Sequence, residues 1–296
     1  MKQFLKVFII VTFIAVALNS CQKEITIVDD LNPPAANTDS IYIDRYYEFE
    51  ETASGLDTLM AYYFKYDSLK RVVEIYSDDF STNVPALDYK YYYNGSDSVP
   101  YKMLEYDGPT DTHPQEYFFT FDNQQRIVKD STRHYNNSGV LDVLELINYS
   151  YVPGKMYAHT RQVSTFPALP PSEEIRLDTA ILNSVGDIVS HKTYVQVGAV
   201  SELNNTSEFT YGTQAGPFAT SSVFKAHHLL PMGEVFIQDL MTHKNLLTQL
   251  EKDENGNVSM NETFTGYQYN SRGLLIECKY GEPGFRGMVR FFYKAL

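Results

Sequence analysis

The chain has 296 residues, with 24 lysines and arginines against 37 aspartates and glutamates, and its formal net charge is −13. An acidic surface of this kind repels phosphate backbones and anionic headgroups, which excludes nucleic acid and a basic membrane-binding face. The two cysteines are too few for a disulfide framework, so a chain of this length must be held together by its hydrophobic core.

A secretory leader occupies residues 1–20. Two lysines precede an apolar stretch of twelve residues, 7–18, which is interrupted only by Thr12, and Leu18-Asn19-Ser20-Cys21 closes the segment. That stretch is shorter than the roughly 20 residues that a bilayer crossing needs, so the leader is expected to be cleaved. Cys21 then becomes the acylated first residue of a lipoprotein, and its acyl chains make the membrane a partner.

Residues 21–40 are predicted to form the acylated N-terminus and a flexible tether. The segment 32–38 has no apolar period and contains two rigid prolines, which is typical of a linker. Gln22-Lys23-Glu24 and Asp29-Asp30 resemble the short charged export signal that some Gram-negative lineages use to send lipoproteins to the outer face. We therefore expect an outer-membrane lipoprotein at the cell surface rather than on the periplasmic face.

A six-residue turn pattern recurs through residues 41–296 and is the main signal of the fold. Each copy opens with Asp or Asn, has Gly or a long polar residue three positions later, and resumes with an aliphatic residue. A side-chain oxygen at the first position accepts hydrogen bonds from backbone amides, and the fourth position often takes a positive φ, which glycine adopts without strain. The pattern predicts hairpins whose turn residues are Asp67, Asp122, Asn136, Gly139, Asn183, Gly186, Asp253, Gly256, Asn270 and Gly273, with Lys70 and Gln125 at the fourth position of the first two copies and a looser copy at Asn94.

The segments between these turns have the two-residue period of half-buried strands. In Tyr62-Tyr63-Phe64-Lys65-Tyr66 and Tyr117-Phe118-Phe119-Thr120-Phe121, for example, aromatic residues recur at alternate positions. Seven hairpins imply about 14 strands, and a sheet of that size must curl, close or split. We therefore predict an all-β fold, a large and strongly curved antiparallel meander or partial barrel.

Residues 217–247 interrupt the hairpin pattern, because their apolar side chains fall at helix-like offsets. The segment predicts one short helical insert that covers an open end of the sheet. Residues 166–171 are a second candidate boundary, but hairpin patterns continue on both sides of them. Residues 41–296 are therefore predicted to be a single domain.

The aromatic-Asp/Asn-x-x-Gly-x-aliphatic hairpins resemble the tyrosine-aspartate repeats of bacterial wall-associated shell proteins. With the lipoprotein box and the insert, they also resemble uncharacterised outer-membrane lipoprotein families that have a porin-like β fold. The resemblance covers most of residues 41–296 and implies an architecture, but it carries over no catalytic residue. The arginine of the shell-protein pattern is present only at Arg71 and Arg126, which argues against a toxin-encapsulating shell.

A search for chemistry finds no zinc-protease, nucleophile-elbow or phosphate-loop motif and no cysteine pair for zinc. Asp107, Asp111 and His113 share a loop and are a candidate site for a hard cation, against the alternative of a solvated turn. His227-His228 point in different directions on any regular element, so at most one of them enters a shared metal site. We predict no catalytic residue, no metal and no cofactor, and a buried structural role for Cys278.

The 24 tyrosines are predicted to fill the core as cross-strand ladders, with an aromatic face for sugars or peptides as the alternative. The preferred function is a non-enzymatic binding or scaffolding lipoprotein whose ligand is a glycan, a peptide or another envelope protein. The alternative is an envelope hydrolase that acts on glycan or peptide with carboxylates converging across strands. Asp78-Asp79 and Glu173-Glu174 are adjacent in strands and point to opposite faces, so neither pair alone forms an acid/base dyad.

Overall fold

The structure is a computed structural model that describes residues 41–81, 84–166, 170–219, 242–282 and 285–295. These residues form sixteen β-strands. The strands are β1 (Ile41–Thr52), β2 (Gly55–Tyr66), β3 (Val72–Asp78), β4 (Ala86–Tyr92), β5 (Lys102–Glu105), β6 (Gln115–Phe121), β7 (Ile127–Tyr135), β8 (Leu141–Val152), β9 (Lys155–Ser164), β10 (Ser172–Leu182), β11 (Ile188–Val197), β12 (Val200–Ala215), β13 (Lys244–Asp253), β14 (Val258–Tyr269), β15 (Leu275–Glu282) and β16 (Phe285–Ala295).

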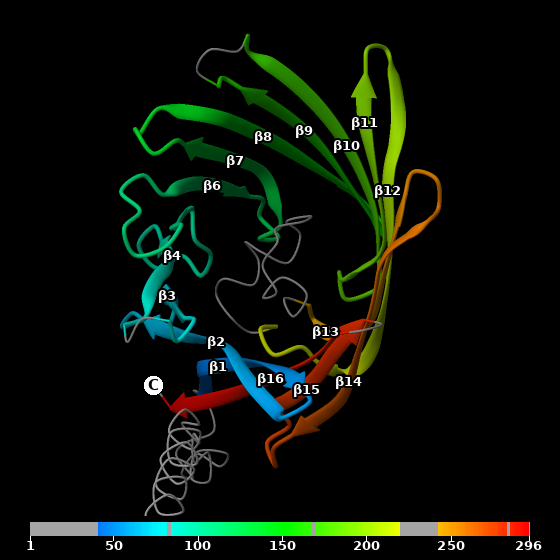
Figure 1. The fold of residues 1–296 in the computed structure, drawn as a ribbon. Helices are drawn as coiled ribbons and strands as arrows, with labels where there is room; N and C mark the ends of the chain where they lie inside the picture. Colours follow the sequence, from blue (N-terminus) through cyan, green and yellow to red (C-terminus); the bar gives the residue numbers. More distant parts are fainter. Residues whose placement is uncertain (1–40, 82–83, 167–169, 220–241, 283–284, 296) are drawn as a thin grey trace, which may run out of the picture. The chain divides into compact units, whose positions relative to one another are not determined.

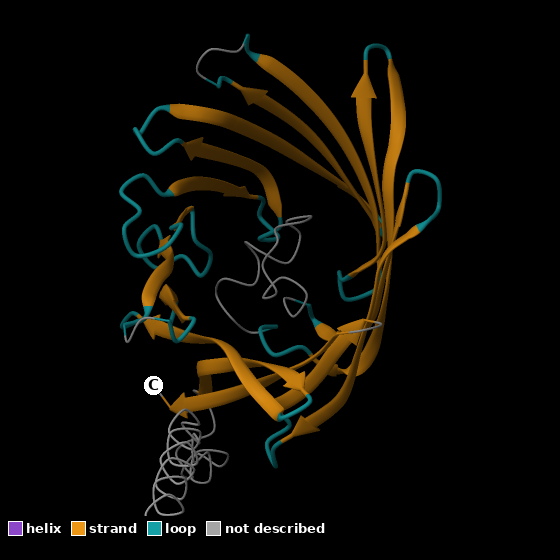
Figure 2. Ribbon diagram, in the orientation of Figure 1, coloured by secondary structure: helices purple, strands orange, loops and turns teal. Residues whose placement is uncertain are grey.

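Each strand pairs antiparallel with its neighbours in the sequence, and β1 also pairs with β16, so the sheet closes into a barrel (Figure 1). Strands and loops alone make up the described part of the chain (Figure 2). The prediction of an all-β antiparallel hairpin fold is confirmed.

The structure refines two details of that prediction. The barrel has two strands more than the turn pattern implied, because short turns such as Pro153-Gly154 and Gly198-Ala199 lack the six-residue pattern. The sheet is also a closed barrel, since Tyr46 on β1 lies opposite Phe291 on β16 in the register.

The predicted helical insert at 217–247 lies mostly outside the described residues. In the part that is described, β13 begins at Lys244, so the end of that segment is a strand and not a helix. The predicted leader at 1–20, the lipid acceptor Cys21 and the tether at 21–40 also lie outside the described residues.

One side-chain oxygen orders each of six hairpin turns. In every case the Oδ1 atom of the opening Asp or Asn accepts hydrogen bonds from the backbone N–H groups two and four residues later, at 2.7–3.1 Å. The opening residues are Asp67, Asp122, Asn136, Asn183, Asp253 and Asn270. The fourth position has positive φ in all six turns, including Lys70 at 64° and Gln125 at 58°.

At one end of the barrel, where even-numbered strands end and odd-numbered strands begin, tyrosine hydroxyl groups make a repeated hydrogen bond. A tyrosine near the end of an even-numbered strand donates its O–H to a backbone carbonyl at the start of the preceding odd-numbered strand. The phenol thereby satisfies a strand-end acceptor while its ring stays in the core. The pairs are Tyr66 with Ile43, Tyr93 with Val72, Tyr151 with Ile127, Tyr211 with Ile188, Tyr267 with Leu246 and Tyr293 with Leu275.

The hydrophobic core lies inside the barrel and is largely aromatic. Tyr46 and Tyr62 stack at 4.6 Å between ring centroids, and Phe218, which follows β12, packs at 5.9–6.2 Å against Tyr46, Phe64 and Phe291. Cys278 is a free and fully buried thiol in this core, and burial raises its pKa to about 12. Many tyrosines thus fill the interior, as the ladder interpretation expected.

The turn geometry predicts the effect of removing one acceptor. We expect Asn270→Ala to lower the free energy of unfolding by about 1–2 kcal/mol, because the N–H groups of Arg272 and Leu274 lose their shared partner. Urea unfolding followed by circular dichroism measures the change.

Asn270→Asp is the matched control, because it keeps the accepting oxygen and should retain wild-type stability. Asn261→Ala, at an exposed position of β14, controls for loss of an amide elsewhere. Equal stability of Asn270→Ala and Asn270→Asp would contradict the role of the side-chain oxygen.

Candidate functional site

The pairing register assigns each strand residue to the inside or the outside of the barrel. Residues that lie directly opposite each other in neighbouring strands share a face, and alternate residues along a strand do too. Ile147 belongs to the core, so Asp130 and Thr160, which lie opposite it on either side, also face inward. Asp178 faces inward because it lies opposite Ala158 of the core.

Applied across β7–β12, this rule defines an inner polar belt at the edge of the aromatic core. Most of its side chains are buried, and they come from six neighbouring strands. The belt consists of Asp130, Thr132, Glu145, Thr160, Arg176, Asp178, His191, Thr193 and Ser207.

Asp178 is a buried carboxylate of the belt whose negative charge is stabilised by neighbouring side chains. Its Oδ1 accepts a hydrogen bond from Thr193 Oγ1 at 2.8 Å and lies 3.2 Å from His191 Nε2, and Arg176 Nε is 3.5 Å from its Oδ2. Burial disfavours the charged form, but His191, Thr193 and the Arg176 charge together hold the pKa of Asp178 below its usual value. The carboxylate is therefore ionised, with its Oδ1 hydrogen-bonded to Thr193 and its Oδ2 near Arg176 but without a hydrogen bond.

Asp130 is the uncompensated carboxylate. Its side chain is 1% exposed, and its Oδ1 has no hydrogen-bond partner. Burial, followed by the charge of Glu145, raises the pKa of Asp130 from 3.8 to about 7. Burial likewise raises the pKa of Glu48, on the inner face of β1, to about 7. Such carboxyl groups change charge close to neutral pH.

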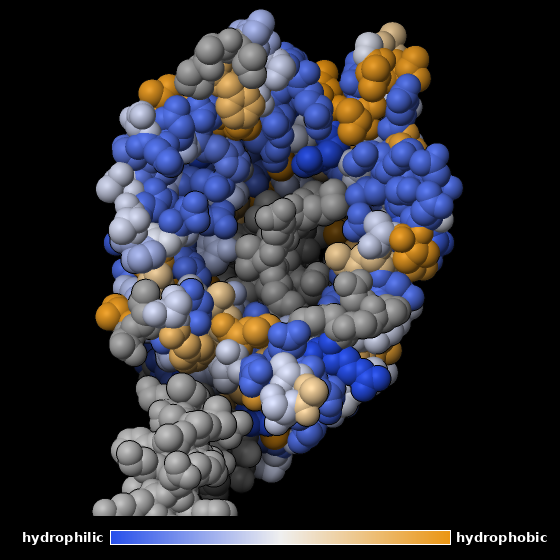
Figure 3. Space-filling view, viewed as in Figure 1, coloured by the Kyte–Doolittle hydropathy of each residue, from blue (hydrophilic) through white to orange (hydrophobic). Residues whose placement is uncertain are grey.

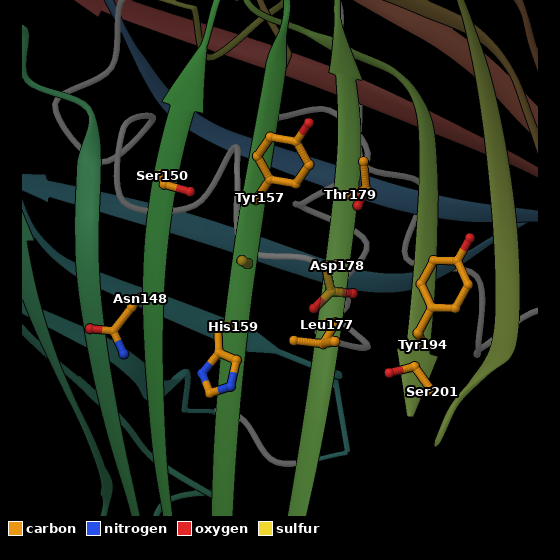
Figure 4. A pocket seen from close by; sticks show the side chains of 10 residues that line it. Asn148, Ser150, Tyr157, His159, Leu177, Asp178, Thr179, Tyr194 and Ser201 are labelled. Atoms are coloured by element: carbon orange, nitrogen blue, oxygen red, sulfur yellow. The ribbon is translucent and has the colours of Figure 1, made fainter. Parts of the chain in front are cut away.

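A second feature lies on the outer face of the barrel. A groove of about 420 Å³ crosses β8–β12, and eight of its ten lining residues belong to the outer face, while Ala158 and Asp178 belong to the inner one. Figure 4 shows Tyr157 from β9 and Tyr194 from β11 on either side of Leu177 and Thr179 from β10. Asn148, Ser150, His159 and Ser201 supply hydrogen-bonding groups around these rings. The groove thus combines two flanking phenol rings with amide, hydroxyl and imidazole groups.

The loop residues proposed for a hard cation serve the loop backbone instead. Asp111 accepts hydrogen bonds from the N–H groups of Asp107 and His113 at 3.0 and 2.8 Å. No group of three His, Cys, Asp or Glu side chains suited to a metal occurs among the residues that the structure describes. His227-His228 lie outside them.

The adjacent carboxylate pairs are also separate from both features. Asp78 and Asp79 accept hydrogen bonds from Phe80 and Ser81 and order the turn after β3. Glu173 pairs with Arg161 on the outer face, at 2.9 Å. Neither pair forms an acid/base dyad in the described structure.

Sequence patterns did not identify the main residues of these two features, which are Asp130, Asp178, His191, Tyr157 and Tyr194. The polar alternation Asp130-x-Thr132-x-His134 signals a polar inner face on β7, but nothing local identifies which face of the strand is inside. The two groove tyrosines lie 37 positions apart in the sequence and meet only through strand pairing.

No protein-family model and no curated protein matches the sequence. Among solved structures, the chain is similar to a porin-like protein from Bacteroides vulgatus, with 10% identity, a TM-score of 0.50, and coverage of 87% of this chain and 100% of that one. The fold is porin-like. A porin-like protein from Bacteroides uniformis matches at 12% identity and a TM-score of 0.45, over 85% of this chain and 98% of that one. A Tc holotoxin pore from Photorhabdus luminescens matches at 9% identity and a TM-score of 0.17, over 78% of this chain and 17% of that one.

The described residues of this porin-like chain include no helix that is long and apolar enough to cross a membrane.

The buried state of Asp130 predicts how stability depends on pH. The folded protein retains this proton up to a pH of about 7, whereas the unfolded chain releases it near 3.8, so the free energy of unfolding falls as the pH rises between these values. Asp130→Asn removes the effect, and we expect it to raise the free energy of unfolding at about pH 8 by on the order of 3 kcal/mol.

Chemical unfolding at several pH values measures this difference. Asp57→Asn, at an exposed position of β2, is the control and should follow the wild-type pH dependence. The assignment of Asp130 is refuted if Asp130→Asn keeps the wild-type slope between about pH 4 and pH 7.

Proposed function

We propose that this chain is a lipid-anchored protein of the cell envelope whose barrel stands in water and binds a glycan without catalysing a reaction. The observation that carries the proposal is the charge on the outside of the barrel. Cross-strand ion pairs occur on widely separated strands of the outer face, including Lys102–Glu116 at 2.5 Å and Arg290–Glu277 at 2.7 Å.

These pairs face outward because each lies next to an inward-facing core residue. Met103 of the core follows Lys102, and Phe291 follows Arg290. Lysine or arginine on the lipid-facing side of a membrane barrel costs about 2–4 kcal/mol near the bilayer midplane. On the face seen in Figure 3, which looks into one end of the barrel, hydrophilic residues are more widespread than hydrophobic ones. An aqueous surrounding suits this outer face better than lipid does.

The leader and Cys21 support attachment by acyl chains, with the tether at 21–40 holding the barrel away from the membrane. The porin-like fold shared with the Bacteroides vulgatus protein is consistent with an envelope location. Display at the cell surface, rather than on the periplasmic face, remains part of the proposal because the charged residues after Cys21 favour it.

The outer groove supports binding of a neutral sugar. Flat phenol faces such as those of Tyr157 and Tyr194 suit the apolar face of a sugar ring, and Asn148 and His159 can hydrogen-bond its hydroxyl groups. The chain carries a net charge of −13, which disfavours anionic glycans.

The second candidate remains an envelope hydrolase. It is favoured by one observation: Asp130 and Glu145 approach each other on the inner face of β7 and β8, and the pKa of each is raised. Hydrolysis of a glycan or peptide by the purified protein, abolished in Asp130→Asn, would replace the binding proposal with this one.

The attachment proposal predicts a simple fractionation result. Cys21→Ala should release the protein from membranes into the soluble fraction, because the barrel exterior has no preference for lipid. Membrane fractionation with an alkaline wash and immunoblotting measures it. A Cys21→Ala protein whose leader has been removed and which still stays in the washed membranes would show that the barrel itself is inserted.

The groove proposal predicts loss of glycan binding when a phenol ring is removed. On a neutral glycan array, Tyr157→Ala and Tyr194→Ala should each weaken binding by about three- to tenfold. Tyr101→Ala is the matched control, because Tyr101 is 39% exposed, as Tyr157 is, but lies outside the groove. Equal losses in all three variants, or no glycan bound by the wild type, would contradict the proposal.

A further inference from the structure

The two phenol rings of the outer groove stand on different strands, and the pairing register determines how far apart they lie. Tyr157 on β9 lies opposite Thr179 on β10. Tyr194 on β11 lies opposite Leu177, two residues earlier on β10. The two tyrosines are therefore separated by two strand spacings across the sheet and by two residues along it, on either side of β10 (Figure 4). At about 4.8 Å between strands and about 3.4 Å per residue, their Cα atoms lie about 12 Å apart.

This separation is too large for one sugar ring to contact both phenols. A hexose within a glycan chain is about as long as one strand spacing, roughly 5 Å. Two such steps lead from one phenol to the other, so sugars stacked on Tyr157 and Tyr194 would have another sugar between them. That middle sugar would lie over Leu177 and Thr179, which line the groove between the two rings.

Each phenol has its own hydrogen-bonding neighbours in the groove. Asn148 and His159 lie opposite each other on β8 and β9, next to Tyr157. On the far side of β10, Ser201 of β12 lies diagonally from Tyr194. All of these residues line the same groove. Their amide, imidazole and hydroxyl groups can pair with sugar hydroxyls at both ends of a bound chain.

The groove is suited to uncharged sugars. Its described outer-facing lining residues include no aspartate, glutamate, lysine or arginine. Arg161 and Glu173, on the same face of β9 and β10, lie outside the lining and form an ion pair with each other at 2.9 Å. A sulfate or carboxylate on the glycan would therefore meet no lysine or arginine among the lining residues.

Given the proposed glycan binding, on which this step rests, we infer that the groove recognises an extended chain of at least three neutral sugars. The chain crosses β9, β10 and β11 diagonally, with its first and third sugars stacked on Tyr157 and Tyr194. In an extended β-1,4-linked chain each sugar is turned over relative to the last, so the first and third present the same face to the protein. Both phenols then meet equivalent apolar faces. An α-1,4-linked chain curves and carries its third sugar out of this line.

Binding should therefore depend on chain length, with a step at three sugars. Calorimetry with β-1,4-linked oligomers of glucose, mannose, xylose and N-acetylglucosamine compares the monomer, dimer and trimer of each. In the series that binds, we expect affinity to rise at most about twofold from monomer to dimer and about three- to tenfold from dimer to trimer, because only the trimer reaches both phenols. Maltotriose, the curved α-1,4-linked trimer, should bind about three- to tenfold more weakly than the extended trimer.

The outcomes separate this inference from glycan binding itself. A monomer that binds as tightly as its trimer, or equal affinity for maltotriose, overturns the inference and leaves glycan binding intact. The same holds if the neutral glycan array is positive but none of these trimers binds. A blank array together with no binding at any chain length contradicts glycan binding, and this inference with it.

Variants assign the step to the two rings. In Tyr157→Ala and in Tyr194→Ala, the trimer should bind no more tightly than the dimer, whereas the dimer should lose at most about twofold, because one phenol remains for it. Tyr101→Ala, outside the groove, should keep the wild-type step. Circular dichroism checks that each variant is folded. Equal losses of dimer and trimer binding in both groove variants, or a step that persists in them, overturn the assignment.

Discussion

The binding of two backbone amides by one side-chain oxygen is the interaction on which this barrel depends. It opens six hairpin turns and determines which strand residues lie opposite each other. At one end of the barrel, the tyrosine hydroxyl bonds hold the strand starts beside the ends of their neighbours. A slip of one residue would exchange the inner and outer faces of a strand, so these local bonds determine the polarity of the whole wall.

That polarity is the main support for the proposal that the barrel stands in water. Most of the aromatic core faces inward and ion pairs such as Lys102–Glu116 face outward, while Phe49 and Phe292 are buried on the outer face of β1 and β16. A barrel that stands in water, as proposed, can carry a binding feature on its outer face, such as the groove between Tyr157 and Tyr194. The proposals of acyl attachment and of glycan binding both depend on this arrangement.

Two of the three carboxylates of the inner polar belt, Asp178 and Asp130, differ in how their burial is compensated. Asp178 is ionised because His191, Thr193 and Arg176 surround it. Asp130 has no comparable partner. Its raised pKa means that the ionised carboxylate lowers the free energy of unfolding. Strongly perturbed pKa values cluster at functional sites, which makes Asp130 the more distinctive of these two carboxylates.

The sequence by itself determined the strand class and most of the turns, because both arise from neighbouring residues. The Asp67 and Asn270 turns are readable from six consecutive positions, and the two-residue period of Tyr62 to Tyr66 specifies a strand. Only the tertiary structure decided the closure of β1 on β16, which joins residues about 250 positions apart. It also decided which side of each strand is inside, and so brought Asp130 and Thr160 to Ile147. Those choices depend on burying all sixteen strands together, a physical requirement that no local segment contains.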